Sequence, residues 1–369
     1  MYRFCFSSLL LGFFFSTVAQ EQPTIKLIFV GDIMGHMPQI ESAKTTPNTY
    51  DYRSCFEYVA PILKGADVAI GNLELTLPGK GPYSGYPMFR SPDALATALR
   101  DAGFDLLVTS NNHSCDGGLL GVTHTLDVLD SLGIQHTGTF RNTAERSALY
   151  PLIVHHGAFR IAIVNATYGT NGVPIPAPSV VNLIDTAQMR LDILEARAQK
   201  PDFIISVMHW GLEYQLNENE VQSTLAKWML SQGVDVVIGG HPHVVQPVKE
   251  ELYLPLGGTT ERKGLVVYSL GNFISNQRQA NTDGGLMFEL TLQKQSGARA
   301  KIISHHYLPI WRWMRLSGGK TTYHVVPIAL YENRTNDLAG MTAAQVTAMK
   351  AFAANTRARL GKYQSTERK

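Results

Sequence analysis

The chain has 369 residues, and 32 Lys and Arg almost balance 30 Asp and Glu, which leaves a formal net charge of +2. This balance gives no electrostatic case for binding nucleic acid or an anionic membrane surface, and we expect no nucleic-acid partner. The length allows two domains, although large α/β enzymes commonly form one domain of this size.

The first residues of the chain have the pattern of an export signal. Arg3 precedes an apolar run from Leu9 to Phe15, and small residues before Gln20 offer a cleavage site. We therefore predict a signal peptide over residues 1–19, cleaved near Ala19, and an extracytoplasmic protein, either periplasmic or secreted. The apolar run is shorter than the roughly 20 residues that cross a bilayer. An uncleaved N-terminal anchor is the alternative.

Two cysteines remain after the predicted cleavage, Cys55 and Cys115. An exported protein can oxidise such a pair, but two cysteines do not form a disulfide framework. The alternative is that both are small buried apolar side chains, and we favour it.

Short apolar runs alternate with helical patterns along the first two thirds of the chain. Each run ends in Gly, Asn, Asp or His, as a strand buried on both faces would when it enters a loop. Helices are predicted from Pro92 to Gly103, from Leu119 to Leu132 and from Glu220 to Gln232, each closed by a glycine. The predicted strands include Thr24–Val30, Val68–Ile70, Leu106–Val108, Phe203–Met208 and Val234–Ile238.

The remaining segments add antiparallel pairing to this pattern. A hairpin is expected around His156-Gly157-Ala158, and strands follow from Gly264 onward. A helix from Thr342 to about Leu360 precedes a charged tail that we expect to fray. The alternation predicts an α/β fold with mixed, mostly parallel sheets. We divide the chain into the signal, one domain over residues 20–330, and a C-terminal helix and tail over 331–369.

Polar side chains of metal-ligand type follow five of the predicted strands. In an open parallel sheet, ligands bind beyond the carboxyl ends of the strands, so these residues are expected to meet in one site. Carboxylates can bridge two cations, imidazoles supply nitrogen, and an Asn carbonyl adds a neutral oxygen. This mixture favours two divalent transition metals, Mn, Fe or Zn, over Mg or Ca. The residues are Asp32, Glu74, Asn112, His113, His209, His241 and His243.

An ordered series of motifs resembles the CapA group of poly-γ-glutamate capsule-synthesis proteins, which are related to calcineurin-like metallophosphoesterases. The series extends over roughly Ile25 to Asn276. The resemblance implies a layered metallophosphoesterase-like β-sandwich flanked by helices. The matching motifs are Gly31-Asp32-Ile33-Met34, Gly71-Asn72-Leu73-Glu74, Asn111-Asn112-His113 with Asp116 and Gly118, Tyr168-Gly169-Thr170-Asn171-Gly172, His209-Trp210-Gly211 with Glu213-Tyr214, Gly240-His241-Pro242-His243 and Ser269-Leu270-Gly271-Asn272-Phe273.

The resemblance also implies roles for the metal ligands and for His113, which would act beside the metals as a general acid. Apart from the resemblance, Arg90 precedes a predicted helix N-terminus, where an anionic substrate group could bind. Asn111, Trp210 and Asn272 are further candidate substrate-binding residues. Trp210 is equally compatible with a core position, and Arg90 with a plain surface charge. The implied metal ligands are Asp32, Glu74, Asn112, His209, His241 and His243.

Two departures from ordinary metallophosphoesterases bear on this assignment. Those enzymes open with Asp-x-His, whereas three residues separate Asp32 from His36 here, so His36 is not assigned as a ligand. Their second block is Gly-Asp, whereas Gly71 is followed by Asn72 and the carboxylate arrives only at Glu74.

The resulting hypothesis is an extracytoplasmic metal-dependent hydrolase. Metal-bound hydroxide would attack a phosphoester or an amide in an anionic polymer or a phosphorylated substrate of the envelope. The alternative is a non-catalytic factor that handles or exports the polymer during capsule biosynthesis. Membrane proteins of capsule synthesis are possible partners in both cases.

Overall fold

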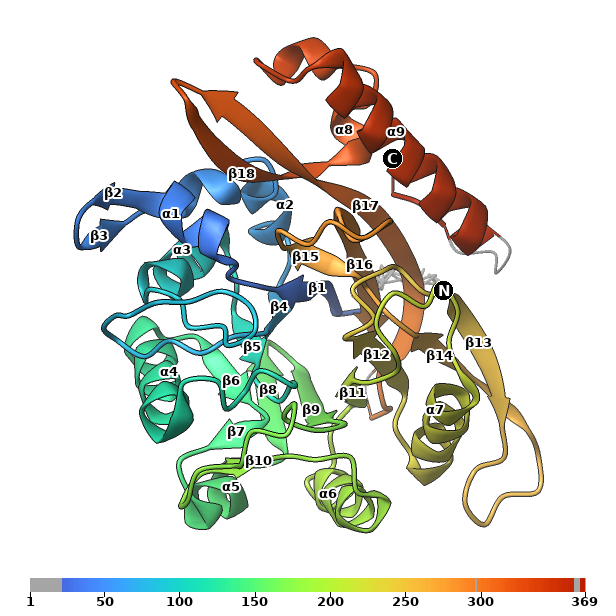
Figure 1. Cartoon of the computed structure of the whole chain (residues 1–369). Coiled ribbons are helices and arrows are strands. Elements are labelled where there is room, and N and C mark those ends of the chain that lie inside the picture. The colour runs from blue at the N-terminus through green and yellow to red at the C-terminus, as the bar shows by residue number, and fades with distance from the viewer. Residues whose placement is uncertain (1–21, 296, 362–365, 369) are drawn as a thin grey trace, which may run out of the picture.

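The computed structural model describes residues 22–295, 297–361 and 366–368 (Figure 1). The predicted signal peptide and its cleavage site lie outside these residues. Within them, two large sheets pack face to face and carry helices on their outer faces. The layered α/β class with mixed, mostly parallel sheets is confirmed.

The first sheet has the strand order β18-β17-β16-β1-β4-β5-β6. Strands β1, β4, β5 and β6 run parallel, and β16, β17 and β18 extend the sheet in antiparallel fashion. Short strand β15 pairs with the end of β1 and sets Asn272 opposite Asp32. The bounds are β1 (Thr24–Ile33), β4 (Val68–Leu73), β5 (Leu106–Val108), β6 (Gln135–Thr137), β15 (Asn272–Ile274), β16 (Gly284–Gln293), β17 (Lys301–Ser317) and β18 (Lys320–Pro327).

The second sheet has the order β13-β14-β12-β11-β9-β8. Its central strands β9, β11, β12 and β14 are parallel, while β8 and β13 pair in antiparallel fashion at the edges. The hairpin predicted around Gly157 is the β8–β9 pair. The bounds are β8 (Leu152–His156), β9 (Phe159–Thr167), β11 (Phe203–His209), β12 (Val236–Gly240), β13 (Val248–Tyr253) and β14 (Arg262–Val267). Two small pairs complete the strands: β2 (Lys44–Thr46) with β3 (Thr49–Tyr50), and β7 (Thr139–Phe140) with β10 (Val180–Val181).

Helices cover both outer faces of this sandwich (Figure 1). Glycines in the left-handed conformation end α3, α4 and α7, at the positions that the sequence predicted. Helix α3 begins at Ala94 rather than at Pro92, because Pro92 makes only a turn-type bond to Leu95. The bounds are α1 (Met37–Ala43), α2 (Ala60–Leu63), α3 (Ala94–Ala102), α4 (Gly118–Leu132), α5 (Thr143–Leu149), α6 (Thr186–Ala198), α7 (Glu220–Gln232), α8 (Ile328–Tyr331) and α9 (Ala343–Leu360).

The main core lies between the two sheets. It joins Phe29 and Ile70 of the first sheet to Ile205 and Ile238 of the second. Burial of these side chains supplies the main stabilising term, about 1.5–3 kcal/mol for each fully buried large apolar residue. The packing also holds the carboxyl ends of β1, β4, β11 and β12 at one common edge.

An aspartate stands directly before each of several parallel strands and fixes its start. The carboxylate of Asp67 accepts the backbone N–H of Lys26, and that of Asp105 accepts the N–H of Ala69. In the second sheet Asp235 accepts the N–H of Ile204 in the same manner. Each bond satisfies a donor on the neighbouring strand, so the register of the parallel strands is tied at their amino ends.

The C-terminal part of the chain packs onto the first sheet. Met349 and Phe352 of α9 belong to the main core. The tail was expected to fray, but residues 366–368 run beside β17, and Glu367 pairs with Arg357 of α9. This ion pair and the backbone bonds to Tyr307 give the charged tail a fixed partner. The division at residue 331 stays a prediction.

Cys55 and Cys115 are both buried and unbridged. This agrees with the favoured interpretation of two small apolar side chains. Burial raises the pKa of the Cys115 thiol to about 11, so the reactive thiolate is suppressed. Among the described residues, no helix combines the length and hydropathy needed to cross a membrane.

Gly31 provides a test of this packing. A Cβ on Gly31 would lie 1.8 Å from the carbonyl oxygen of Gly271, which accepts the N–H of Asp32. Gly31→Ala must therefore separate β1 from the segment before β15, and we expect the unfolding free energy to fall by about 3 kcal/mol, the upper end of the usual cost of overpacking. Urea denaturation measures it. Gly361→Ala, where an added Cβ meets no described atom, is the control and should change little; an equally small effect of both would show that the strands adjust freely.

Candidate metal centre

The centre of the site is the carboxylate of Glu74, which follows β4. Both of its oxygens are buried and have no hydrogen-bond donor among the described residues. His209 Nε2 lies 3.5 Å from Oε1, and His243 Nε2 lies 3.8 Å from the same atom. A buried carboxylate without donors is costly unless a cation neutralises it.

Two groups of candidate ligands share this carboxylate. Asp32, Glu74 and His209 form one group, and Glu74, His241 and His243 form the other. Within each group the ligand atoms lie within 4.8 Å of one another. These residues could hold metal ions, with Glu74 shared between the two groups, because each group supplies oxygen and nitrogen donors that could converge on one ion.

Asp32 is held rigidly at the end of β1. Its Oδ1 accepts from the Asn72 amide at 2.8 Å, and its Oδ2 accepts the backbone N–H of His241 at 3.1 Å. His243 Nδ1 approaches the same Oδ2 at 3.0 Å and Asn272 Oδ1 at 3.1 Å. With Nδ1 engaged in this way, His243 presents Nε2 toward Glu74, the arrangement that orients metal-binding imidazoles.

Asn112 and His209 form the other side of the centre. Asn112 Oδ1 lies 2.8 Å from His209 Nε2, and the Asn72 amide lies 3.2 Å from His209 Nδ1. The Asn112 amide donates in turn to Asn171 Oδ1 at 3.4 Å. The sequence did not assign Asn171 a role, although it stands in one of the recognised motifs.

The backbone after β12 brings two imidazoles to Glu74. His241 and His243 have φ values of 95° and 58°, in the left-handed region that residues with a side chain rarely adopt. A Cβ on Gly240 would lie 2.7 Å from Asp32 Oδ1. Such backbone strain persists only where the surroundings enforce it, and it clusters at functional sites.

The electrostatics of the centre disfavour a charged Glu74 carboxylate and protonated imidazoles when no cation is bound. Burial raises the pKa of Glu74 well above its usual value, and the charges of Asp32 and Glu213 add to the effect. Burial lowers the pKa of His209 well below its usual value and that of His241 to about 3. Both imidazoles are therefore neutral, the form that binds metal ions, and His241 Nδ1 has no hydrogen-bond partner among the described residues.

His113 stands beside this cluster. Its Nδ1 lies 2.7 Å from Asp116 Oδ2, and its ring meets Phe89 edge-on at 4.6 Å. Asp116 also accepts the backbone N–H of Phe89, which fixes the carboxylate. His113 belongs to neither group of candidate ligands. His36 also lies outside both groups, and its Nδ1 faces the N–H of Asn276 and the side chain of Gln39.

The candidate substrate-binding residues occupy different surroundings. The Asn111 amide donates hydrogen bonds to Asn72 Oδ1 and to the carbonyl of Leu73, and Asn272 is buried against His243. Both therefore support neighbouring site residues.

Trp210 lies in the core, where its indole donates to the Tyr268 carbonyl at 2.9 Å. This position matches the core alternative. Arg90 is half-buried and its Nε donates to Ser84 Oγ at 3.2 Å.

Residues 26–277 match the family described as bacterial capsule synthesis protein PGA_cap. The chain belongs to this family. Capsule biosynthesis protein CapA of Bacillus anthracis is 26% identical over 298 residues, which cover 77% of this chain and 68% of that protein. PGA biosynthesis protein CapA of Bacillus subtilis (strain 168) is 26% identical over 279 residues, with coverages of 74% and 69%. The resemblance to the CapA group is thereby confirmed.

The candidate centre of this PGA_cap member falls entirely within the matched residues. Among solved structures, a calcineurin-like phosphoesterase from Bacillus subtilis aligns with a TM-score of 0.46 and 14% identity, over 91% of this chain and 98% of that chain. Strands β16 to β18 and helix α9 lie beyond residue 277, where the family match ends.

Besides Asn171, sequence reasoning missed three residues at the centre. Asn72 joins Asp32 to His209, and Tyr168 packs its ring 4.6 Å from that of His241. Glu213 Oε1 lies 3.9 Å from His243 Nε2, and the Glu213 side chain is 42% exposed. All three stand in the quoted motifs, so the signal was present, but only coordinates show which side chains turn inward.

Glu74→Gln separates a ligand from a structural carboxylate. Without metal, the variant should unfold at the same temperature as the native chain or at a higher one, because Gln has no negative charge whose burial costs free energy. Mn²⁺ or Zn²⁺ at about 100 times its Kd should stabilise the native chain by about 2.7 kcal/mol and the variant hardly at all. Differential scanning calorimetry measures both. An equal rise in Tm for the variant would remove Glu74 from the ligand set.

Metal binding should also release protons. The raised pKa of Glu74 keeps its carboxyl protonated over a wider pH range in the metal-free fold, and a metal must displace that proton. Apparent affinity should therefore fall as pH falls below this pKa, by up to about tenfold per pH unit. Calorimetric titration in buffers of different ionisation enthalpy counts the released protons. A proton count that does not change with pH would contradict the bridging role.

Proposed function

We propose that this chain is a metal-dependent hydrolase that acts outside the cytoplasm on an anionic substrate of the cell envelope, in the biosynthesis of a capsule polymer. The observation that carries the proposal is the buried Glu74 carboxylate, which has no donor among the described residues and is shared by two groups of candidate ligands. Family membership supports the link to capsule biosynthesis, and the pattern of the first residues supports export.

The proposed cofactors are two divalent ions of Mn, Fe or Zn. Asp32 and His209 would hold one ion and His241 and His243 the other, with Glu74 shared and the Asn112 carbonyl beside His209. When bound, such a pair supplies Lewis-acid activation of water and of the scissile group. The amide of Asn72 keeps Asp32 and His209 at fixed separation, so the ligands are pre-organised before any ion binds.

His113 is proposed to deliver a proton to the leaving group. Asp116 accepts from Nδ1 and holds the ring, which leaves Nε2 as the atom that can carry a transferable proton. The edge of Phe89 against the ring restricts rotation. Asp116 is accordingly a positioning residue, since it acts through His113.

The bond cleaved is proposed to be a phosphoester or an amide. Purified mature protein, loaded in turn with Mn²⁺, Fe²⁺ and Zn²⁺, should be assayed on chromogenic phosphoesters and on γ-glutamyl peptides. Turnover on one class and not on the other identifies the bond. Metal binding without turnover on either class would overturn the enzymatic proposal in favour of a polymer-handling factor.

The His113→Ala variant tests the acid. Turnover on a substrate with a poor leaving group should fall by about 10²–10⁴-fold, while a substrate with a good leaving group suffers less because it needs less protonation. Metal content, measured by mass spectrometry, should remain unchanged. Equal losses on both substrates, or loss of metal, would move His113 from acid to ligand.

Asp116→Asn is the matched companion variant. It keeps the size of the side chain and removes the charge that orients His113. As with His113→Ala, turnover should fall more on the substrate with the poor leaving group, but the loss should be smaller. The pH profile of kcat should also change. An unchanged pH profile would show that Asp116 does not position His113 and serves only to bind the backbone N–H of Phe89.

A further inference from the structure

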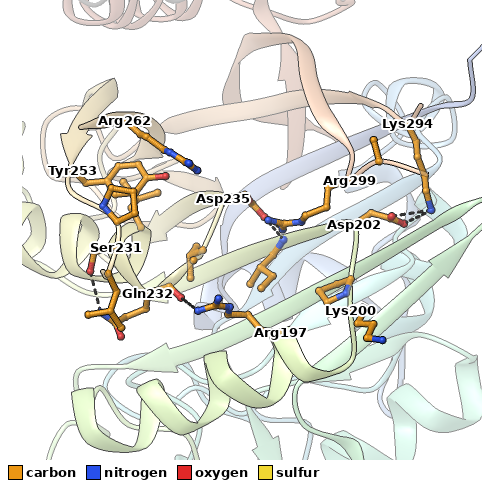
Figure 2. Close-up of a pocket in the computed structure, with 18 of the residues that line it drawn as sticks. Arg197, Lys200, Asp202, Ser231, Gln232, Asp235, Tyr253, Arg262, Lys294 and Arg299 are labelled. Carbon is orange, nitrogen blue, oxygen red and sulfur yellow. Dashed lines mark hydrogen bonds and ion pairs between the residues drawn. The ribbon is translucent and has the colours of Figure 1, made fainter. Parts of the chain in front are cut away.

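A large cavity lies away from the metal centre. It has a volume of about 720 Å³ and opens beside the amino ends of β11 and β12, next to Asp202 and Asp235 (Figure 2). The candidate ligand His209 stands at the other end of β11. At about 3.3 Å per residue, β11 separates the two places by roughly 23 Å.

Most of the charged side chains in the wall of this cleft are basic. Five of them come from the end of helix α6, the start of β14 and the connection between β16 and β17, against two carboxylates. The described wall therefore has an excess of three positive charges, whereas the whole chain has a formal net charge of only +2. The basic residues are Arg197, Lys200, Arg262, Lys294 and Arg299.

The two carboxylates are already occupied. Asp202 pairs with Lys294 at 2.8 Å and Asp235 with Arg299 at 2.6 Å. Each also accepts a backbone N–H from the adjoining strand, which fixes its place. These two acids consequently have little capacity to neutralise the other cations of the cleft.

Three cations are left without an acidic partner among the described residues. The Arg197 guanidinium donates to the carbonyl of Gln232 at 3.3 Å, and the side chains of Lys200 and Arg262 make no ion pair within the described chain. Lys200 has a φ of 51°, so a lysine occupies the left-handed position after α6 that glycine usually fills.

Helix ends alone do not account for this charge. Helices α6 and α7 both end at the cleft, and each C-terminus carries about −0.5 of an elementary charge. Together they offset about one of the three excess positive charges. The cleft remains electropositive and is large enough for an extended ligand, since ligand pockets typically measure about 300–1,000 Å³.

We propose that this cleft is a second binding site, remote from the metal centre, for a linear polyanion that carries repeated carboxylate or phosphate groups. A concave wall with separated cations suits a chain better than a flat bilayer surface. The cleft thus retains an anionic chain independently of the hydrolysis proposed above.

The test uses fluorescently labelled poly-γ-glutamate and, in a separate arm, labelled polyphosphate, with binding followed by anisotropy at low and at physiological salt. The variant is Arg262→Glu combined with Lys200→Glu, both exposed positions. Affinity at low salt should fall at least about tenfold, and the salt dependence should become shallower. Preference for one probe assigns the repeating group as carboxylate or phosphate.

The control is Arg190→Glu combined with Lys350→Glu, which changes the net charge equally at exposed positions outside the cleft wall. Its affinity should stay within about twofold of the native value. Equal losses in both double variants, or no binding of either probe by the native chain, would overturn the proposal. Binding to anionic lipid vesicles without binding to either polymer would also overturn it, in favour of a membrane contact.

Measurements of metal content and hydrolysis distinguish the cleft proposal from the hydrolase proposal. The cleft variant should keep its metal and its turnover on small chromogenic substrates, because β11 separates the cleft from the centre. Conversely, His241→Ala should retain the affinity for the polymer probes. If His241→Ala instead abolishes polymer binding, the polyanion binds at the metal centre and the cleft proposal fails while the hydrolase proposal stands.

Discussion

The arrangement of this site depends on the buried carboxylate of Glu74. Its oxygens have no donor among the described residues, although the surrounding polar groups are almost fully engaged with one another. Burying a charge without a partner costs several kcal/mol, so the fold tolerates Glu74 only if a proton or a cation neutralises it. Imidazoles with depressed pKa values lie next to it, and neutral imidazole is the form that can bind a metal ion.

The two-sheet sandwich makes this arrangement possible by ending its parallel strands at one edge. Asp32 follows β1, His209 ends β11, and Gly240 ends β12, while the core between the sheets fixes their separation. Close approach depends on glycine, because a side chain at Gly240 would strike Asp32. Strain at His241 and His243 is then offset by the packing and hydrogen bonds around them.

Much of this was predictable from the sequence, because the side chains of interest follow apolar runs whose strand character is evident. Asp32, Glu74, Asn112, His209, His241 and His243 do meet in one place. Side-chain direction was not predictable. Asn111 and Asn272 also stand in the family motifs, yet their side-chain amides form hydrogen bonds with neighbouring residues. A residue's place in a motif does not reveal whether it faces the ligand or supports one that does.

Trp210 illustrates the same limit, because it follows the candidate ligand His209 directly and yet turns into the core beside Tyr268. Alternation along an extended chain sends neighbours to opposite faces, and the sequence leaves open which face is the site. The cation-rich cleft was missed for another reason. Its residues come from segments far apart in the chain, and the balanced net charge gave no sign that cations would gather there.

The most direct test of the central claim is anomalous diffraction from crystals grown with Mn²⁺. The account predicts two anomalous peaks, roughly 3.5–4 Å apart, with the Glu74 carboxylate between them. One peak would lie by Asp32 and His209 and the other by His241 and His243. Fully occupied ions elsewhere with none at Glu74, or a Glu74 carboxyl that stays free of metal at saturating Mn²⁺, would contradict it.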